Sequence, residues 1–390
     1  MIDRVKIADT SAASGALMSI QALRGMSVMG IVLIHVQFYF SAKFGMPGFL
    51  PQFNIGAACV DVFFVISGFI MVYASERLFG QPGGMRTYFL RRIARIVPMY
   101  WAATTVILIY LVLQYGSVGA AMDGASLSYV IASYAFIPYA TTFHPSGWPT
   151  PLHGVGWTLN YEMFFYTLFG LCIALPRRML MLVLGSLFCV LIAVHYLWPD
   201  LPNPWAFWSN PLIIEFVFGM LIAGAYREGI RLRGWLAHAL VFCALAVLGW
   251  SWYQAHFFDP SSWLRVPIWG VPALLIVGGF ALSDKPVARN LFWRTFGFLG
   301  DASYSIYLVH TITLGVPRLL FSRWIDPTVW PWFYVAAMLA VMMAASLLFY
   351  LYVEKPVIAA LQRRIDDRGR RQVEWAQRAE ALAINSPARG

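Results

Sequence analysis

The sequence predicts an all-α polytopic integral membrane protein with about ten transmembrane helices, one short re-entrant helix and both termini in the cytoplasm. Of its 390 residues, 60% are hydrophobic and only 12% are charged, and the mean hydropathy is +0.66. An average soluble domain is about 25% charged, so a soluble fold of this length would lack the polar surface to cover its core. Apolar runs of about 20 residues, long enough to cross a bilayer, recur along the chain. The composition therefore excludes a soluble enzyme, a disordered chain and a nucleic-acid-binding protein.

Ten apolar runs are expected to span the bilayer. They lie near residues 21–41, 56–76, 96–115, 155–175, 178–198, 210–226, 235–254, 265–282, 300–321 and 331–354. A shorter apolar stretch over 129–138 is too short to span and predicts a re-entrant or interfacial helix. We expect one membrane domain over residues 1–355, followed by a charged cytoplasmic tail over 356–390.

The basic residues orient these spans. Most of the 28 Lys and Arg fall in segments that face the cytoplasm if the chain starts inside and 129–138 does not span. Counting 129–138 as a span would place most of the later arginines outside, against the positive-inside rule. Both termini are therefore expected in the cytoplasm.

Several ionisable residues lie inside the expected spans, where each charge costs at least ~2.5–3.5 kcal/mol. His35, Asp61, Glu162 and Glu215 all fall at a similar depth, roughly 7–10 Å below the outer surface at ~1.5 Å per residue. This coincidence predicts one shared polar cavity. The alternative is that each of them pairs locally and holds helices together.

Arg24 and His35 are expected on one face of the first span. They are eleven residues apart, and eleven steps of about 100° end about 20° from three full turns. A cationic group near the cytoplasmic end would then share a face with an imidazole deeper in the membrane. Histidine accepts and returns protons near neutrality, which suits a general base, and a structural histidine is the alternative. His310 is the second mid-span histidine, for which a role in the core is the simpler interpretation.

An arginine cluster follows the second span. If a helix begins near Thr87, Arg91 and Arg95 share a face and Arg92 lies near the same end. Such a cluster at the cytoplasmic mouth suits the phosphates of a polyanionic ligand. It suits lipid headgroups and the determination of topology equally well.

Five segments, in order, resemble motifs of the acyltransferase-3 family of membrane O-acyltransferases. They are QALRGMSVMGIVLIH, VDVFFVISGFIM, RRIARIVPMYW, GVGWTLNYEMFFY and the closing pair GDASYSIYLVHT and VEKP. The form WTLNYEMFFY resembles the exopolysaccharide-production branch, with Thr158 where the family usually has serine. This replacement keeps a hydroxyl group.

The resemblance implies an enzyme of the bacterial inner membrane that uses acyl-CoA, usually acetyl-CoA, from the cytoplasm. The implied acceptor is a hydroxyl of a cell-surface or exported carbohydrate, and polysaccharide-assembly machinery is an expected partner. No tightly bound cofactor and no metal site are expected, and the four cysteines follow no metal-ligand spacing.

Acyl transfer from a thioester needs a base, a site that stabilises the oxyanion, and groups that position the donor. His35 is the expected base, with Asp61 or Glu162 as its acidic partner. The expected donor-binding residues are Arg24, Arg91, Arg92, Arg95, Ser303 and Tyr304, with packing as the alternative for the last two. The expected acceptor-side residues are Trp157, Tyr161, Glu215 and His310.

A multispan transporter, or a flippase for a lipid-linked glycan, is the alternative function. Polar residues near the membrane midplane also mark solute and proton pathways. The lack of an internal repeat in the sequence weakens this alternative, and a flippase would not depend on His35. The identities of the acceptor and of the acyl group stay open.

Overall fold

The computed structural model describes residues 2–45, 55–117, 120, 126–140, 148–254, 263–285, 290–326 and 328–367. Regular structure in these ranges is helical, apart from one isolated bridge between Leu232 and Ser283. The predicted all-α class is therefore confirmed.

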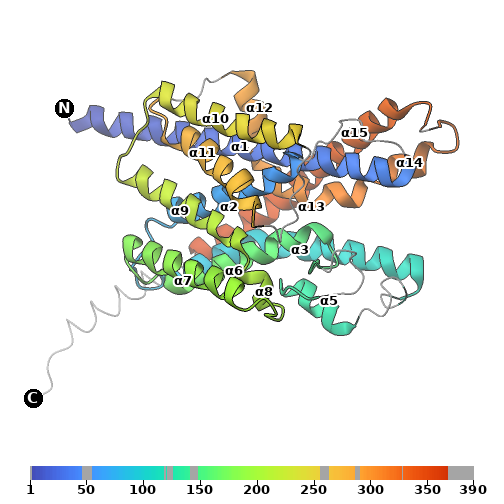
Figure 1. Cartoon of the computed structure of the whole chain (residues 1–390), viewed down its shortest axis with the longest axis horizontal. Helices are drawn as coiled ribbons and strands as arrows, with labels where there is room; N and C mark the ends of the chain where they lie inside the picture. Colours follow the sequence, from blue (N-terminus) through green and yellow to red (C-terminus); the bar gives the residue numbers. More distant parts are fainter. Residues whose placement is uncertain are drawn as a thin grey trace, which may run out of the picture.

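The helices pack into one bundle, and the long ones run roughly along the long axis of the molecule, which is horizontal in Figure 1. In chain order they are α1 (Ile2–Phe44), α2 (Ile55–Ala74), α3 (Gly84–Tyr115), α5 (Leu127–Tyr134), α6 (Trp157–Cys172), α7 (Arg177–Leu197), α8 (Trp205–Trp208), α9 (Ile214–Arg227), α10 (Gly234–Tyr253), α11 (Val271–Leu282), α12 (Leu291–Asp301), α13 (Ser303–Thr313), α14 (Val316–Phe321) and α15 (Pro331–Phe349). Short 3₁₀ turns precede α6 (Gly154–Gly156) and α9 (Pro211–Ile213), and π-helical turns lie at Val266–Gly270 and Tyr350–Glu354.

Six helices within the described ranges are long and apolar enough to cross a membrane. They are Leu17–Lys43, Gly56–Ala74, Gly84–Tyr115, Arg177–Leu197, Gly234–Tyr253 and Pro331–Asp367. The other four expected spans correspond to the shorter helices α6, α9, α11 and α13. The chain is thus a multi-pass membrane protein, while the number of ten spans and the side of the termini stay predictions.

The short helix expected over 129–138 is α5, which covers the 8 residues Leu127–Tyr134 and so begins two residues and ends four residues earlier than predicted. At ~1.5 Å per residue it measures about 12 Å, far less than the ~30 Å of a hydrocarbon core. Hydrogen bonds tie it to its neighbours: the Tyr100 hydroxyl on α3 donates to the Ser133 carbonyl, and the Tyr129 hydroxyl donates to the Thr150 carbonyl. These contacts fit the predicted re-entrant or interfacial helix.

The expected domain boundary at residue 355 falls inside a continuous helix. After Phe349 the chain passes through the π-helical turn and stays helical to Asp367. Residues 368–390 of the expected tail lie outside the described residues, so the boundary stays a prediction.

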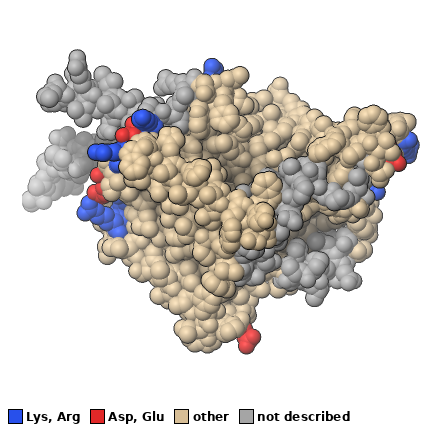
Figure 2. All heavy atoms as spheres, turned by 45° about the horizontal axis from the view of Figure 1, so that its top comes forward, with Lys and Arg blue, Asp and Glu red and all other residues tan. Residues whose placement is uncertain are grey.

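Charged side chains gather mainly at the two ends of the long axis, and a wide uncharged band separates them on the face shown in Figure 2. One end carries a network in which Arg177 contacts Glu76 and Glu228 at 3.4 and 2.5 Å, and Arg178 contacts Glu228 at 2.8 Å. The hydrogen bond from Arg178 and its charge hold the pKa of Glu228 below its ordinary value. An uncharged band between charged ends is the surface that a bilayer requires.

Two helix crossings at the centre are too close for any side chain larger than hydrogen. A Cβ atom built on Gly300 of α12 would lie 1.8 Å from the Gln21 carbonyl oxygen of α1. One built on Gly219 of α9 would lie 1.9 Å from the Val65 carbonyl oxygen of α2. Small residues allow this close backbone approach between membrane helices. The crossings hold α1 against the α12–α13 segment and α2 against α9.

We predict that Gly300→Ala destabilises the protein by about 1–3 kcal/mol, because its methyl group must push α12 away from α1. Gly297→Ala is the matched control on the same helix, since a Cβ at that position meets no heavy atom within 4 Å. Thermal unfolding of the purified proteins in detergent measures both effects. Equal midpoints for Gly300→Ala and the wild type would contradict the close crossing.

Candidate functional site

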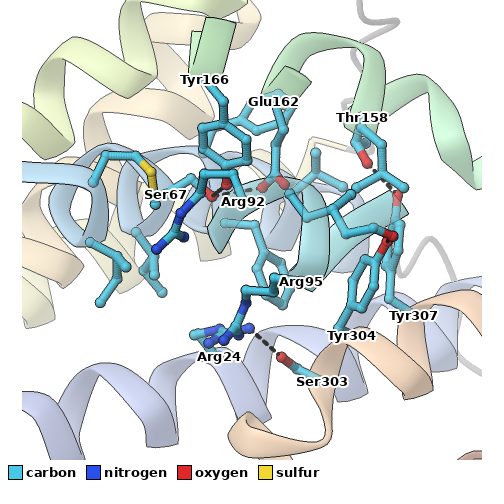
Figure 3. Close-up of a pocket in the computed structure, with 18 of the residues that line it drawn as sticks. Arg24, Ser67, Arg92, Arg95, Thr158, Glu162, Tyr166, Ser303, Tyr304 and Tyr307 are labelled. Atoms are coloured by element: carbon cyan, nitrogen blue, oxygen red, sulfur yellow. Dashed lines mark hydrogen bonds between the residues drawn. The ribbon is translucent and has the colours of Figure 1, made fainter. Parts of the chain in front are cut away.

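A cavity of about 370 Å³ lies among α1, α2, α3, α6 and α13 (Figure 3). Apolar side chains make up most of its wall. Its polar lining residues are Gln21, Arg24, Ser67, Arg92, Arg95, Thr158, Glu162, Tyr166, Ser303, Tyr304 and Tyr307. These residues come from five helices that are distant in the sequence, so the cavity exists only in the folded bundle.

The cavity is elongated along α1. Its lining runs from Leu17 to Ile31 on this helix, fourteen residue steps or about 21 Å. Ala74 of α2 lines the Leu17 end and Val60 of α2 lines the Ile31 end, because α2 runs antiparallel to α1. The cavity therefore extends through a large part of the bundle's thickness.

Three guanidinium groups and one carboxylate line the cavity: Arg24, Arg92 and Arg95 face Glu162 (Figure 3). Arg24 donates a hydrogen bond of 2.9 Å to the Ser303 hydroxyl of α13. The Nε atom of Arg92 is buried, and no described residue accepts its hydrogen. A buried donor without an acceptor is costly, so this nitrogen is available to an acceptor group on a ligand.

Glu162 accepts a hydrogen bond of 2.6 Å from the Ser67 hydroxyl, and the Tyr166 hydroxyl lies 3.5 Å from the same serine oxygen. Arg24 and Arg95 interact with this carboxylate electrostatically. Hydroxyl donors and two cations thus compensate the burial of Glu162.

A second carboxylate, Glu354, lies behind the cavity wall. It is 3% exposed and accepts a short hydrogen bond from the Ser305 hydroxyl of α13. It also acts electrostatically on Arg24 and Arg95. Three arginines against two carboxylates leave the cavity with a positive charge, which favours an anionic ligand.

His35 and His310 form a pair one helical turn beyond Ile31. The His310 Nε2 and His35 Nδ1 atoms lie 3.4 Å apart, and the ring centroids lie 4.9 Å apart. His35 Nδ1 also lies 2.8 Å from the Ile31 carbonyl oxygen. If Nδ1 carries the hydrogen and donates it to this carbonyl, Nε2 keeps its lone pair and can accept a proton.

The arrangement of α1 confirms one geometric expectation. Arg24 contacts Ser303 and His35 contacts His310, and both partners lie on α13. The eleven-residue spacing therefore does place Arg24 and His35 on one helix face.

Two hydroxyl groups line the cavity toward its Ile31 end. The Tyr307 hydroxyl of α13 lies 2.7 Å from the Val155 carbonyl oxygen and 2.7 Å from the Thr158 Oγ1 atom of α6. Thr158 Oγ1 lies 3.2 Å from the same carbonyl. The Tyr307 ring also lies near His310, three residues later on α13, with centroids 6.0 Å apart.

The expected shared cavity for His35, Asp61, Glu162 and Glu215 is wrong, because only Glu162 lines the cavity. Asp61 instead accepts two hydrogen bonds from Arg265, from Nε at 3.1 Å and from the terminal guanidinium nitrogen at 2.8 Å. Asp61 is therefore paired with an arginine rather than with His35.

Glu215 also lies outside the cavity, contrary to its expected acceptor-side position. It is fully buried, and it interacts with Asp61 and Arg265. The physical reason is the helix face. Asp61 shares the side of α2 that carries Val65 and Gly68 and packs on α9, whereas Ser67 lies on the side that lines the cavity. Equal depth in the membrane does not place residues on the same side of a helix.

Among the expected donor-binding residues, Arg91 is the exception. It is half exposed and pairs with Asp366 at 2.9 Å, outside the cavity that Arg92 and Arg95 line. Arg91 and Arg92 precede Arg95 by four and three residues, and either spacing puts two side chains on one helix face. The sequence alone therefore could not show which of the two lines the cavity together with Arg95. Tyr304 lines the cavity as expected, and its hydroxyl donates to the Ile96 carbonyl at 2.8 Å.

Trp157 and Tyr161 form part of an aromatic cluster beside the cavity. The Tyr161 ring stacks on Phe207 at 4.1 Å, and the Trp157 ring contacts Phe64 and Trp148 edge to face. Phe64 itself lines the cavity. The two expected acceptor-side aromatics therefore support the wall and do not line the cavity themselves.

Sequence reasoning missed several polar residues of this region. They are Ser67, Thr158, Tyr166, Tyr307 and Glu354 as parts of the cavity or its support, and Arg265 as the partner of Asp61. Thr158 and Tyr166 lie four residues before and after Glu162, a helical spacing that could have identified both. Arg265 gave no such signal, because its partner lies 204 positions away.

The comparisons with known proteins agree with the sequence motifs. A family model described as an acyltransferase domain, that of acyltransferase family 3, matches residues 18–351. The chain is 34% identical over 271 residues to the exopolysaccharide production protein ExoZ of Rhizobium meliloti, covering 68% of this chain and 78% of that protein.

More distant relatives match over most of the chain. It is 24% identical to the acyltransferase MdmB of Streptomyces mycarofaciens, over 89% of this chain and 93% of that protein. It is 22% identical to the peptidoglycan O-acetyltransferase OatA of Listeria monocytogenes, over 80% of this chain and 51% of that protein. No solved structure matches the chain.

We predict that Arg265→Met destabilises the fold by about 3–5 kcal/mol, because it leaves the buried carboxyl group of Asp61 without its partner. The double variant Asp61→Leu with Arg265→Met is the control and should recover part of the loss, since apolar pairs replace buried ion pairs well. Denaturation of the purified proteins in detergent compares the three. A single variant as stable as the wild type would contradict a buried ion pair at this position.

Proposed function

Since the chain belongs to the acyltransferase-3 family, we propose that it moves an acyl group, in the first place acetyl, from cytoplasmic acyl-CoA to a hydroxyl of a cell-surface or exported carbohydrate. The chain is an acyltransferase. The choice of acyl-CoA as the donor rests on one observation. In the cavity Arg24, Arg92 and Arg95 outnumber the carboxylates, so an anionic ligand is favoured.

The donor is an elongated molecule with phosphates at one end and a thioester at the other. Arg24 lies midway along the lining of α1, seven residues from both Leu17 and Ile31, and the Ile31 end beyond it has apolar and hydroxyl-bearing walls. Phosphates beside the arginines and the thioester toward Ile31 would match this distribution of charge. The buried Nε hydrogen of Arg92, which has no acceptor among the described residues, would find one in a phosphate oxygen.

His35 is the proposed general base. Its Nδ1 atom is hydrogen-bonded to the Ile31 carbonyl, which leaves Nε2 free to accept a proton. Nε2 would take the proton of the acceptor hydroxyl while the hydroxyl oxygen attacks the thioester carbon. His310 lies where a carboxylate partner was expected, and we propose that it orients the His35 ring. The three arginines are proposed to stabilise the negative charge of the donor, and Glu162 is proposed to hold Arg24 and Arg95 in place.

The acceptor is proposed from the relatives. ExoZ is named for exopolysaccharide production and OatA is named as a peptidoglycan O-acetyltransferase. A carbohydrate polymer or its precursor is therefore the proposed acceptor class, and the OatA name supports acetyl as the group. Family membership favours acyl transfer over the transporter or flippase alternative.

We also propose the cellular setting. The enzyme would lie in the bacterial inner membrane with residues 1–355 as its membrane domain, 356–390 as a charged cytoplasmic tail, and polysaccharide-assembly machinery as a partner. Acyl-CoA would be a substrate, without a tightly bound cofactor.

His35→Ala should lower O-acylation at least about 100-fold, the usual contribution of a positioned general base. The measurement is the O-acetyl content of exported polysaccharide from a deletion strain that expresses each variant. His238→Ala is the matched control, because the exposed His238 on α10 contacts the Gly234 carbonyl four residues earlier just as His35 contacts that of Ile31. Normal acylation by His35→Ala at equal membrane abundance would contradict the assignment.

Arg92→Ala and Arg95→Ala should each raise the KM for acetyl-CoA about 10- to 100-fold, with a smaller effect on kcat. A charge-assisted hydrogen bond contributes about 1.5–3 kcal/mol, and a residue distant from the reacting carbonyl acts mainly on binding. Arg24→Ala should also lower kcat, since Arg24 shares a helix face with His35. Thiol release from acetyl-CoA by purified protein with its carbohydrate acceptor measures these constants.

Arg91→Ala is the control for this series, because Arg91 pairs with Asp366 outside the cavity and should leave the KM unchanged. Acetyl-CoA should act only from the cytoplasmic face of oriented vesicles. An unchanged KM in Arg92→Ala, or equal use of donor from the two faces, would refute the donor site.

A further inference from the structure

The hydroxyl groups at the Ile31 end of the cavity form a closed hydrogen-bond arrangement. The Tyr307 hydroxyl has one hydrogen, and the Val155 carbonyl can only accept, so Tyr307 donates to Val155 across 2.7 Å. Thr158 Oγ1 lies 2.7 Å from the Tyr307 oxygen, where either hydroxyl can donate, and 3.2 Å from the Val155 carbonyl, which can accept from it. Thr158 and Val155 are 7% and 5% exposed. The arrangement ties the start of α6 to the middle of α13.

The position of these groups separates two regions. Tyr307 and Thr158 line the cavity, on the opposite side of the pocket from Arg92 (Figure 3). His310 lies three residues beyond Tyr307 on α13, with ring centroids 6.0 Å apart, and it contacts His35. His35 does not line the cavity, so Tyr307 lies along α13 between the cavity residue Ser303 and the histidine pair that includes the proposed base.

We propose that the Thr158–Tyr307–Val155 arrangement is a seal that keeps water away from the donor thioester and opens only when the carbohydrate hydroxyl enters. This inference rests on the proposed function, because it assumes that the cavity holds acyl-CoA. Opening requires only the breaking of these hydrogen bonds and rotation of two side chains. A carbohydrate can stabilise the open state through the rest of its contacts, which a single water molecule cannot make.

The seal prevents a defined side reaction. In hydrolysis the water oxygen bonds to the thioester carbon and the carbon–sulfur bond breaks. The CoA sulfur takes one proton of the water, and the carboxylic acid that forms releases the other. Transfer differs only in that a sugar oxygen replaces the water oxygen, so access to the thioester decides between the two products.

Tyr307→Phe and Thr158→Val each remove one hydroxyl and keep the shape of the side chain. Loss of a hydrogen bond between neutral groups shifts an equilibrium by about 2- to 12-fold. Hydrolysis of acetyl-CoA without carbohydrate should rise by this factor in each variant. Thr158→Ser keeps the hydroxyl and should hydrolyse acetyl-CoA at the wild-type rate.

Two matched controls test whether any lost hydroxyl has the same effect. Tyr334→Phe removes a buried tyrosine hydroxyl that donates to the Ile325 carbonyl at 2.8 Å, and Thr167→Val removes a hydroxyl on the exposed side of α6. Neither residue lines the cavity. Both should leave hydrolysis at the wild-type rate.

The experiment combines two measurements on the full-length protein. Proteoliposomes with acetyl-CoA and no carbohydrate report hydrolysis as thiol release, and cells expressing each variant report the O-acetyl content of exported polysaccharide. The expected result is faster hydrolysis in Tyr307→Phe and Thr158→Val, with less acetylation in cells. The seal is overturned if hydrolysis is unchanged in both Tyr307→Phe and Thr158→Val, or if it rises equally in the controls. In that case, acetylation of polysaccharide by the wild-type protein leaves the proposed function intact. Cells whose wild-type protein adds no acetyl group overturn the proposed function itself, and the seal with it.

Discussion

Three guanidinium groups placed inside a membrane protein are the constraint on which the rest of this structure depends. Arginine keeps its charge even when it is buried, so each group needs acceptors or counter-charges from neighbouring helices. Arg24 uses Ser303 of α13, and Glu162 of α6 and Glu354 after α15 supply negative charge. The groups that compensate the arginines thus come from α6 and α13, which enclose the cavity, and from the π-helical turn behind its wall. Their compensation is incomplete, and the remaining positive charge is what makes the cavity suited to an anion.

The same constraint explains why α2 separates two sets of buried charges. One side of this helix presents Ser67 to Glu162 and the cavity, and the other presents Asp61 to Arg265. Mixing the sets would let Asp61 neutralise the cavity arginines, which would weaken their attraction for phosphate. The close crossing of α2 and α9 at Gly219 fixes the rotation of α2. Tight backbone packing therefore also decides which acid meets which arginine.

The sequence was sufficient for the fold class, for the short helix α5, and for the common face of Arg24 and His35, because helical periodicity and apolar length encode all three. It also identified all three arginines that line the cavity, Arg24, Arg92 and Arg95, together with Arg91, which lies outside it. It failed for Asp61, because membrane depth can be counted along a chain but helix rotation relative to a distant partner cannot. Arg265 shows the same limit: an arginine at the first position of an expected span is 2% exposed and pairs with an acid contributed by another helix.

Binding and chemistry are separated along α1 in the proposed reaction. Arg24 and His35 lie on one helix face, eleven residues or about 16 Å apart, so phosphates held at the first would direct the thioester toward the second. Interactions remote from the reacting bond can then fix its position, which lowers the barrier without contact at the reacting atoms. A rigid helix sets this distance better than a loop would, because its length does not change when the ligand enters. The separation also leaves room for a barrier between donor and base, and Tyr307, on the helix that contacts both Arg24 and His35, occupies that place.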